Sequence, residues 1–138
     1  MKKSAKKILC LMLIVLLISS MAVPAAAQSG TGTSQSGYSY NWEVYHSDTY
    51  GFAQINTNAR PTDVTASGRN WVYDDLNDEA GYSERSTVTG YAGATATPNN
   101  IINIGTEDDP TYVRGIVQVT YGTFYVGSEK IGENLSSG

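Results

Sequence analysis

The chain has 138 residues, with 13 acidic and nine basic side chains, a formal net charge of −4 and a single cysteine, Cys10. This length is enough for one small domain. The acidic balance disfavours nucleic acid as a partner, because nucleic-acid-binding proteins present a basic patch or stripe, and one cysteine cannot form an internal disulfide.

Residues 1–27 have the organisation of a signal peptide. They begin with a lysine-rich segment at Lys2–Lys7, which is followed by an apolar run at Ile8–Ile18. A small-residue cleavage pattern then follows at Ala25–Ala27. We therefore expect cleavage after Ala27. The alternative is an uncleaved membrane span, since the stretch is about 20 residues long, but Pro24 and the serines before it fit a cleavage region better.

The mature chain, Gln28–Gly138, would keep five basic side chains against all 13 acidic ones, a net charge of −8. It would contain no cysteine, which excludes disulfides, thiolate metal sites and a cysteine nucleophile. We expect a secreted, extracellular protein of bacterial origin. We expect neither a nucleic-acid partner nor stable membrane anchoring after cleavage.

Three regions are predicted within the mature chain. Residues 28–37 are all Gly, Ser, Thr or Gln and predict a flexible linker. Residues 38–131 alternate in short runs between turn residues and predict a single β domain, and residues 132–138 predict a loose tail. The expected strands are Tyr38–Tyr45, Tyr50–Asn56, Thr62–Ala66, Asn70–Tyr73, Tyr82–Tyr91, Ala92–Thr97, Ile101–Ile104 and Thr111–Val126.

The pattern of short strands indicates an all-β fold. No segment sustains a helical apolar repeat over two turns, and turn signals recur about every 8–12 residues. We predict a small antiparallel β-sandwich, Ig-like or jelly-roll-like, with a small β-barrel as the alternative. Gly90 and Gly93 flank a predicted bend or bulge.

The longest β-like run, Thr111–Val126, is rich in β-branched and aromatic residues. Read with a period of two, it places Val117 and Val119 on an apolar face and Arg114 and Gln118 on a wetter face. We expect a central strand whose two valines both contribute to the core.

The most acidic stretch is the predicted loop 74–81. Closely spaced oxygen ligands suit a hard cation such as Ca²⁺, the one candidate cofactor. The spacing departs from a calcium-binding loop, because Ala80 stands where the sharp-turn glycine belongs. The alternative is a solvated hairpin loop with local turn bonds. The candidate metal ligands are Asp74, Asp75, Asn77, Asp78 and Glu79.

All ten tyrosines lie beyond residue 37. A tyrosine combines a large apolar ring with a polar tip, which suits binding surfaces. Trp42 and Trp71 are expected in the core. The candidate ligand-binding patch consists of four tyrosines close together in the sequence, Tyr38, Tyr40, Tyr45 and Tyr50, and its expected partner is an extracellular protein or a polysaccharide.

His46 is the only histidine, and we expect it exposed in a turn with Ser47 and Asp48. A Ser-His-Asp triad would need this residue, but the Gly-x-Ser-x-Gly motif is absent from the sequence. We therefore expect no enzymatic activity.

These observations favour a secreted, non-enzymatic β-sandwich that acts as an extracellular binding or interaction domain. One alternative is a secreted antagonist, either a bacteriocin-like toxin or an inhibitor of an extracellular hydrolase. The other is an extracellular matrix subunit that assembles by edge-strand pairing through Thr111–Val126.

Overall fold

The computed structural model describes residues 25–58 and 62–138. All regular structure in these two ranges is β-strand, and they contain no helix that is long and apolar enough to cross a membrane. Most of the expected signal peptide, and residues 59–61 between the expected strands Tyr50–Asn56 and Thr62–Ala66, lie outside the described residues. The first strand starts at Ala26, so the expected cleavage point after Ala27 falls inside it.

Sheet A has four antiparallel strands in the order β1-β2-β3-β7. The first three follow one another in the chain as hairpins. The strands are β1 (Ala26–Thr33), β2 (Ser39–His46), β3 (Gly51–Thr57) and β7 (Gly93–Ala96).

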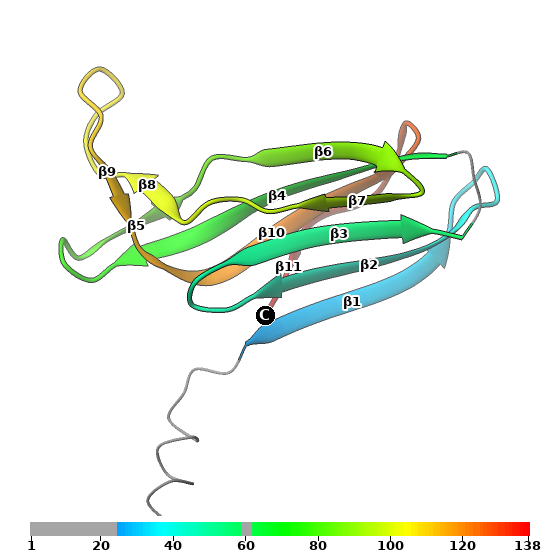
Figure 1. Ribbon diagram of the computed structural model, residues 1–138, viewed down its shortest axis with the longest axis horizontal. Coiled ribbons are helices and arrows are strands. Elements are labelled where there is room, and N and C mark those ends of the chain that lie inside the picture. The colour runs from blue at the N-terminus through cyan, green and yellow to red at the C-terminus, as the bar shows by residue number, and fades with distance from the viewer. Residues whose placement is uncertain (1–24, 59–61) are drawn as a thin grey trace, which may run out of the picture.

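Sheet B has the order β11-β10-β4-β5, and β6 also pairs with β4. Its strands are β4 (Asp63–Asp74), β5 (Glu79–Tyr82), β6 (Ser86–Tyr91), β10 (Ile116–Val126) and β11 (Glu129–Ser136). A separate two-stranded sheet pairs β8 (Ile101–Asn103) with β9 (Tyr112–Arg114), and the loop between these two strands projects from one end of the molecule (Figure 1).

Sheets A and B form two layers around one apolar core (Figure 1). Each strand alternates between the two faces of its sheet, so every second side chain points into the core. The core cluster draws on both layers and consists of Val44, Ala53, Ile55, Val64, Ala66, Ala94, Ala96, Phe124 and Val126. The predicted all-β, antiparallel sandwich is confirmed.

The corner between β6 and β7 joins the two sheets at one edge. Ala92 has a positive φ of 58°, and a Cβ added to Gly90 would collide with the carbonyl oxygen of Gly93. Only glycine fits this approach of two backbone segments. The bend predicted between Gly90 and Gly93 is confirmed.

β1 shows that the expected flexible linker over residues 28–37 is wrong for most of its length, since β1 pairs with β2 along its whole extent. The rings of Trp42 and Tyr40 lie over this strand. A Cβ added to Gly30 would stand 2.6 Å from the Trp42 ring, and one added to Gly32 would collide with the Tyr40 hydroxyl. The strand therefore has no apolar side chain after Ala27 and gives no periodic signal.

β10 is a central strand, as predicted, but it covers only Ile116–Val126 of the expected strand Thr111–Val126. Residues Tyr112–Arg114 form β9, which pairs with β8 in a separate sheet, so the expected single strand is wrong over its first part. β10 pairs with β4 on one side and with β11 on the other. Over Tyr121–Val126 both edges of its backbone are paired, so this part of the run is not the free edge that a matrix subunit would need for pairing between chains.

A bulge at Gln118 divides β10 into two registers. Val117 lies opposite Val72, whereas Val119 lies opposite Trp71, with a register shift between them. A shift of one residue turns the following side chains to the other face of the sheet. Val117 is only 1% exposed, while Val119 is half-buried on the outer face. The expectation that both valines lie in the core is wrong for Val119.

Other predicted boundaries also differ from the structure. The strand expected over Tyr82–Tyr91 is divided between β5, which ends at Tyr82, and β6, which starts at Ser86. The expected break at Ser67 and Gly68 does not occur, because β4 runs through both residues. The expected loose tail 132–138 is mostly strand β11, whose Leu135 packs against the core. Asn134 has a φ of 48°, and this irregularity hides the strand's alternation in the sequence.

Buried polar side chains close one end of the space between the sheets. Thr120 Oγ1 donates to Asn70 Oδ1 at 2.6 Å, and the Thr120 backbone N–H donates to Ser137 Oγ at 2.9 Å. Asn70 Nδ2 donates to the carbonyl oxygens of Pro98 and Asn99 at 3.1 and 2.9 Å. Because these buried groups satisfy one another, they fix the loop that carries Asn99.

Candidate functional site

The outer face of sheet B presents polar and aromatic side chains along its central strands. In β4 the buried residues alternate with residues that point outward, away from the core. The outward residues of β4 are Thr65, Ser67, Arg69, Trp71 and Tyr73, and across from the first four lie Tyr125, Thr123, Tyr121 and Val119 of β10.

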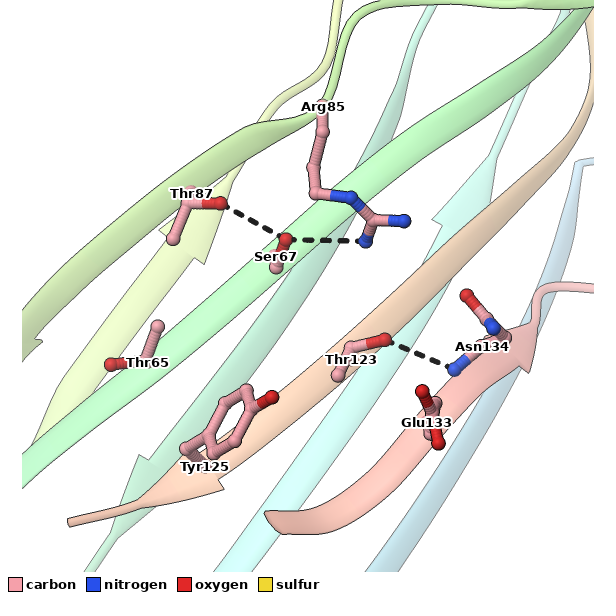
Figure 2. A pocket seen from close by; sticks show the side chains of 8 residues that line it. All are labelled: Thr65, Ser67, Arg85, Thr87, Thr123, Tyr125, Glu133 and Asn134. Atoms are coloured by element: carbon pink, nitrogen blue, oxygen red, sulfur yellow. Dashed lines mark hydrogen bonds between the residues drawn. The ribbon is translucent and has the colours of Figure 1, made fainter. Parts of the chain in front are cut away.

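One part of this face is hollowed into a groove of about 350 Å³, which we call the hydroxyl groove (Figure 2). Four hydroxyls of serine or threonine, one phenol, one guanidinium, one carboxylate and one amide line it, on β4, β6, β10, β11 and the link that precedes β6. The residues are Thr65, Ser67, Arg85, Thr87, Thr123, Tyr125, Glu133 and Asn134. The volume falls within the usual range of small-ligand sites.

Local hydrogen bonds hold the hydroxyl groups in place (Figure 2). Ser67 Oγ and Thr87 Oγ1 lie 3.0 Å apart, and Arg85 Nη1 donates to Ser67 Oγ at 3.3 Å. On the other wall the Asn134 backbone N–H donates to Thr123 Oγ1 at 3.0 Å. A hydroxyl has one donor and two acceptor positions, so these bonds orient the groups. Ser67 and Thr123 are buried, so the hydroxyls with capacity for a ligand are those of the more exposed Thr65 and Thr87.

The groove contains charges of both signs. Arg85 lies on the wall formed by β4 and β6, and Glu133 lies across the groove on β11 (Figure 2). Lys130 Nζ is 3.3 Å from a Glu133 carboxylate oxygen, and both side chains are largely exposed. The groove therefore has no strong preference for a charged ligand of either sign.

An aromatic cluster continues the same face beyond the groove. The Arg69 guanidinium carbon lies 3.9 Å from the centre of the Tyr82 ring. Trp71 and Tyr121 both meet this ring edge-on, at centroid distances of 4.8 and 6.1 Å. The expected core position is thus wrong for Trp71, which lies on the outer face, whereas Trp42 packs against the core and stacks on Phe124 at 5.8 Å.

The four tyrosines of the predicted binding patch separate onto two faces of sheet A. Tyr38 and Tyr40 pack against the core. Tyr45 lies on the outer face, 5.4 Å from the Tyr50 ring and 5.1 Å from the Phe52 ring. The hydrogen bond between Tyr45 and Tyr50 raises the pKa of Tyr50. The four tyrosines therefore do not form the single binding surface that we predicted. Residues an odd number of positions apart on a strand, such as Tyr40 and Tyr45, point to opposite faces of the sheet.

The predicted acidic loop is a hairpin turn between β4 and β5. Asp74 is buried and accepts hydrogen bonds from the Leu76 backbone and the Asn77 amide, at 3.1 and 2.5 Å. Asp78 Oδ1 accepts from the Tyr73 hydroxyl at 2.8 Å, which raises the pKa of Tyr73. Asp75 and Glu79 are exposed. Such local turn bonds fit the hairpin-loop interpretation, and residues 25–58 and 62–138 contain no group of three or more His, Cys, Asp or Glu placed to hold a metal ion.

His46 is not the exposed turn residue that we expected. It is the last residue of β2, is only 8% exposed, and its Nδ1 lies 2.5 Å from Ser137 Oγ. Burial lowers the pKa of His46, and Asp48 opposes this shift weakly. Ser137 is itself 1% exposed, so this pair is enclosed in the polar end of the sandwich and does not present a nucleophile to a substrate.

Sequence reasoning missed the hydroxyl groove because its residues come from distant segments. The signal that was present is the pairs of Ser and Thr two positions apart in β4 and β6, which are Thr65 with Ser67 and Thr87 with Thr89. Neither a known protein family, nor a curated protein, nor a solved structure matches this chain.

Proposed function

We propose that this protein is a secreted, non-enzymatic β-sandwich that acts as an extracellular binding domain for a neutral polysaccharide. The observation that carries the proposal is the hydroxyl groove, with its four Ser and Thr hydroxyls oriented beside Tyr125. A sugar presents hydroxyl groups that both donate and accept, and the groove offers the same two capacities. A protein partner with a flat surface would not need a concave site that is lined by hydroxyl groups.

Charge supports a neutral sugar over an acidic one. The groove balances Arg85 against Glu133, and the chain as a whole is acidic, with 13 acidic and nine basic side chains. A polyanionic chain would be repelled over a long range, although salt would screen part of this effect. The expected binding is therefore insensitive to ionic strength.

The lining also favours binding over cleavage of the sugar. Glycoside hydrolysis commonly uses two carboxyl groups on either side of the scissile bond. The lining of the hydroxyl groove contains one carboxylate, that of Glu133. This arrangement suits a hydrogen-bonding site rather than a pair of catalytic acids.

Affinity electrophoresis through gels containing hydroxyethylcellulose, arabinoxylan, galactomannan or laminarin tests the proposal. We expect at least one of these neutral polymers to retard the protein, and Thr87→Val to weaken the retardation. Valine keeps the shape and strand propensity of threonine, and one lost hydrogen bond costs about 0.5–1.5 kcal/mol, a few-fold to about tenfold in Kd.

Thr95→Val is the matched control, because Thr95 is an exposed threonine of β7, in the other sheet. It should migrate as the unchanged protein does. Retardation by alginate alone, an acidic polymer, would contradict the proposed ligand class, as would the absence of retardation in all four neutral gels.

A further inference from the structure

We propose a second sugar-binding subsite in the cleft between β5 and the β8–β9 sheet, where a sugar ring stacks between Tyr82 and Tyr112. The cleft has a volume of about 580 Å³ and is lined by Tyr82, Glu84, Asn99, Ile101, Asn103 and Tyr112. This inference rests on the proposed function and extends it from a single groove to a ligand that is a linear chain of sugars.

The Tyr82 ring is held in a fixed orientation. The Arg69 guanidinium covers one face of the ring at 3.9 Å, and Trp71 and Tyr121 support it edge-on. Because one face is covered, the ring can offer a ligand only its other face. Tyr82 is 47% exposed and lines the cleft, so the ring remains accessible to a ligand. A ring that is already ordered loses little conformational entropy when a ligand stacks on it.

The opposite wall is also anchored. Tyr112 is 64% exposed on β9, and β9 pairs with β8 in register. Asn103 Oδ1 accepts hydrogen bonds from the backbone of Gly105 and Thr111, both at 2.9 Å, which ties the base of the projecting loop together. The Asn99 backbone is fixed from below by the fully buried Asn70. The cleft is thus built on supported segments on both sides.

The chemistry of the cleft differs from that of the hydroxyl groove. Two tyrosine rings and Ile101 offer apolar contact, whereas Glu84 and the two asparagines offer polar groups beside it. A pyranose ring has the matching character, with apolar C–H faces and a rim of hydroxyls, and aromatic rings bind such amphipathic partners well. The carboxylate of Glu84 again disfavours an acidic sugar.

The outer face of sheet B connects the hydroxyl groove to the Tyr82 wall of the cleft. Ser67 of the groove and Trp71, which packs on Tyr82, are four residues apart on β4, which is about 13 Å along a strand. Arg69 lies between them on the same face. A linear oligosaccharide that occupies both sites gains affinity through effective concentration without new contacts.

Affinity electrophoresis of Tyr112→Ala in the same four neutral gels tests the second subsite. Loss of one stacking ring should weaken retardation roughly tenfold. Because Tyr112 is largely exposed, the variant should keep its Tm. Tyr91→Ala is the matched control, since Tyr91 is 72% exposed and lines neither site, and it should bind as the unchanged protein does.

The outcomes separate this inference from the proposed function. If Tyr112→Ala binds as tightly as the unchanged protein while Thr87→Val binds more weakly, the second subsite is wrong and the groove stands. If Tyr112→Ala weakens binding and Thr87→Val does not, the cleft is supported and the groove assignment fails. If no neutral polymer retards the protein, both proposals fail.

Discussion

His46 is buried at the end of the sandwich, where its imidazole contacts Ser137. Burial disfavours the charged imidazolium, so the folded protein holds the pKa of His46 below its ordinary value of about 6.5. The unfolded chain therefore takes up a proton at a higher pH than the folded chain does. Stability is full above about pH 6.5 and declines as the pH falls from there through the lowered pKa of His46.

Thermal unfolding at a series of pH values checks this expectation. The Tm of the unchanged protein should fall as the pH drops below about 6.5, and the Tm of His46→Gln should change less over the same window. The two proteins share all their other ionisable groups, so the difference between their slopes reports on His46. Equal slopes for the two proteins between neutral pH and pH 5 would show that His46 does not control this response.

At the scale of single residues, the sequence indicates which chemical groups are present but not whether each side chain points to the core or to solvent. Tyr40 and Tyr45 both belong to a tyrosine-rich segment, yet one packs on the core and the other faces outward. Similarly, a histidine beside Ser47 and Asp48 suggests an exposed turn, but Ser137, some 90 residues further along the chain, covers it. Contacts between residues that are far apart in sequence decide these positions.

β10 carries the sharpest prediction at the scale of an element. Val117 is buried opposite Val72, whereas the bulge at Gln118 turns Val119 to the outer face. Val117→Asp should abolish cooperative folding, because it buries an unpaired charge. Val119→Asp should leave the domain folded with a modest loss, of about 1 kcal/mol, because its side chain reaches solvent.

Urea unfolding monitored by far-UV circular dichroism distinguishes the two variants. The wild-type protein and Val119→Asp should both show a single cooperative transition, and Val117→Asp should show none. Similar destabilisation by both substitutions would mean that the period-two reading of the whole run is right and that the bulge does not exist in solution.

The strength of the apolar alternation decides which strands are predictable from the sequence. Strands with strong alternation, such as β2 and β3, are found close to their true limits. β1 is missed because Gly30 and Gly32 make room for aromatic rings from β2, so the strand has no hydrophobic pattern of its own. β11 is missed because Asn134 interrupts its alternation. Register and bulges depend on partner strands, and a single segment does not encode them.

At the scale of the whole molecule, composition is enough to predict the fold class but not the site. A chain of short alternating runs with a single cysteine folds as an antiparallel sandwich. The hydroxyl groove combines Ser67, Thr87, Thr123 and Asn134 from four strands, and these meet only after the order β11-β10-β4-β6 has formed. No local motif in the sequence indicates this strand order. The tyrosine-rich segment and the acidic loop are local signals, so they are the sites that the sequence predicts.

The central claim is that the outer face of sheet B binds a neutral polysaccharide, and amide chemical-shift mapping by NMR tests it most directly. The probe is the hexasaccharide of the neutral polymer that most strongly retards the protein. We predict shifts at Ser67, Thr87 and Asn134, which line the groove. Shifts confined to the outer face of sheet A, around Tyr45 and Tyr50, or no shifts at saturating hexasaccharide, would contradict the claim.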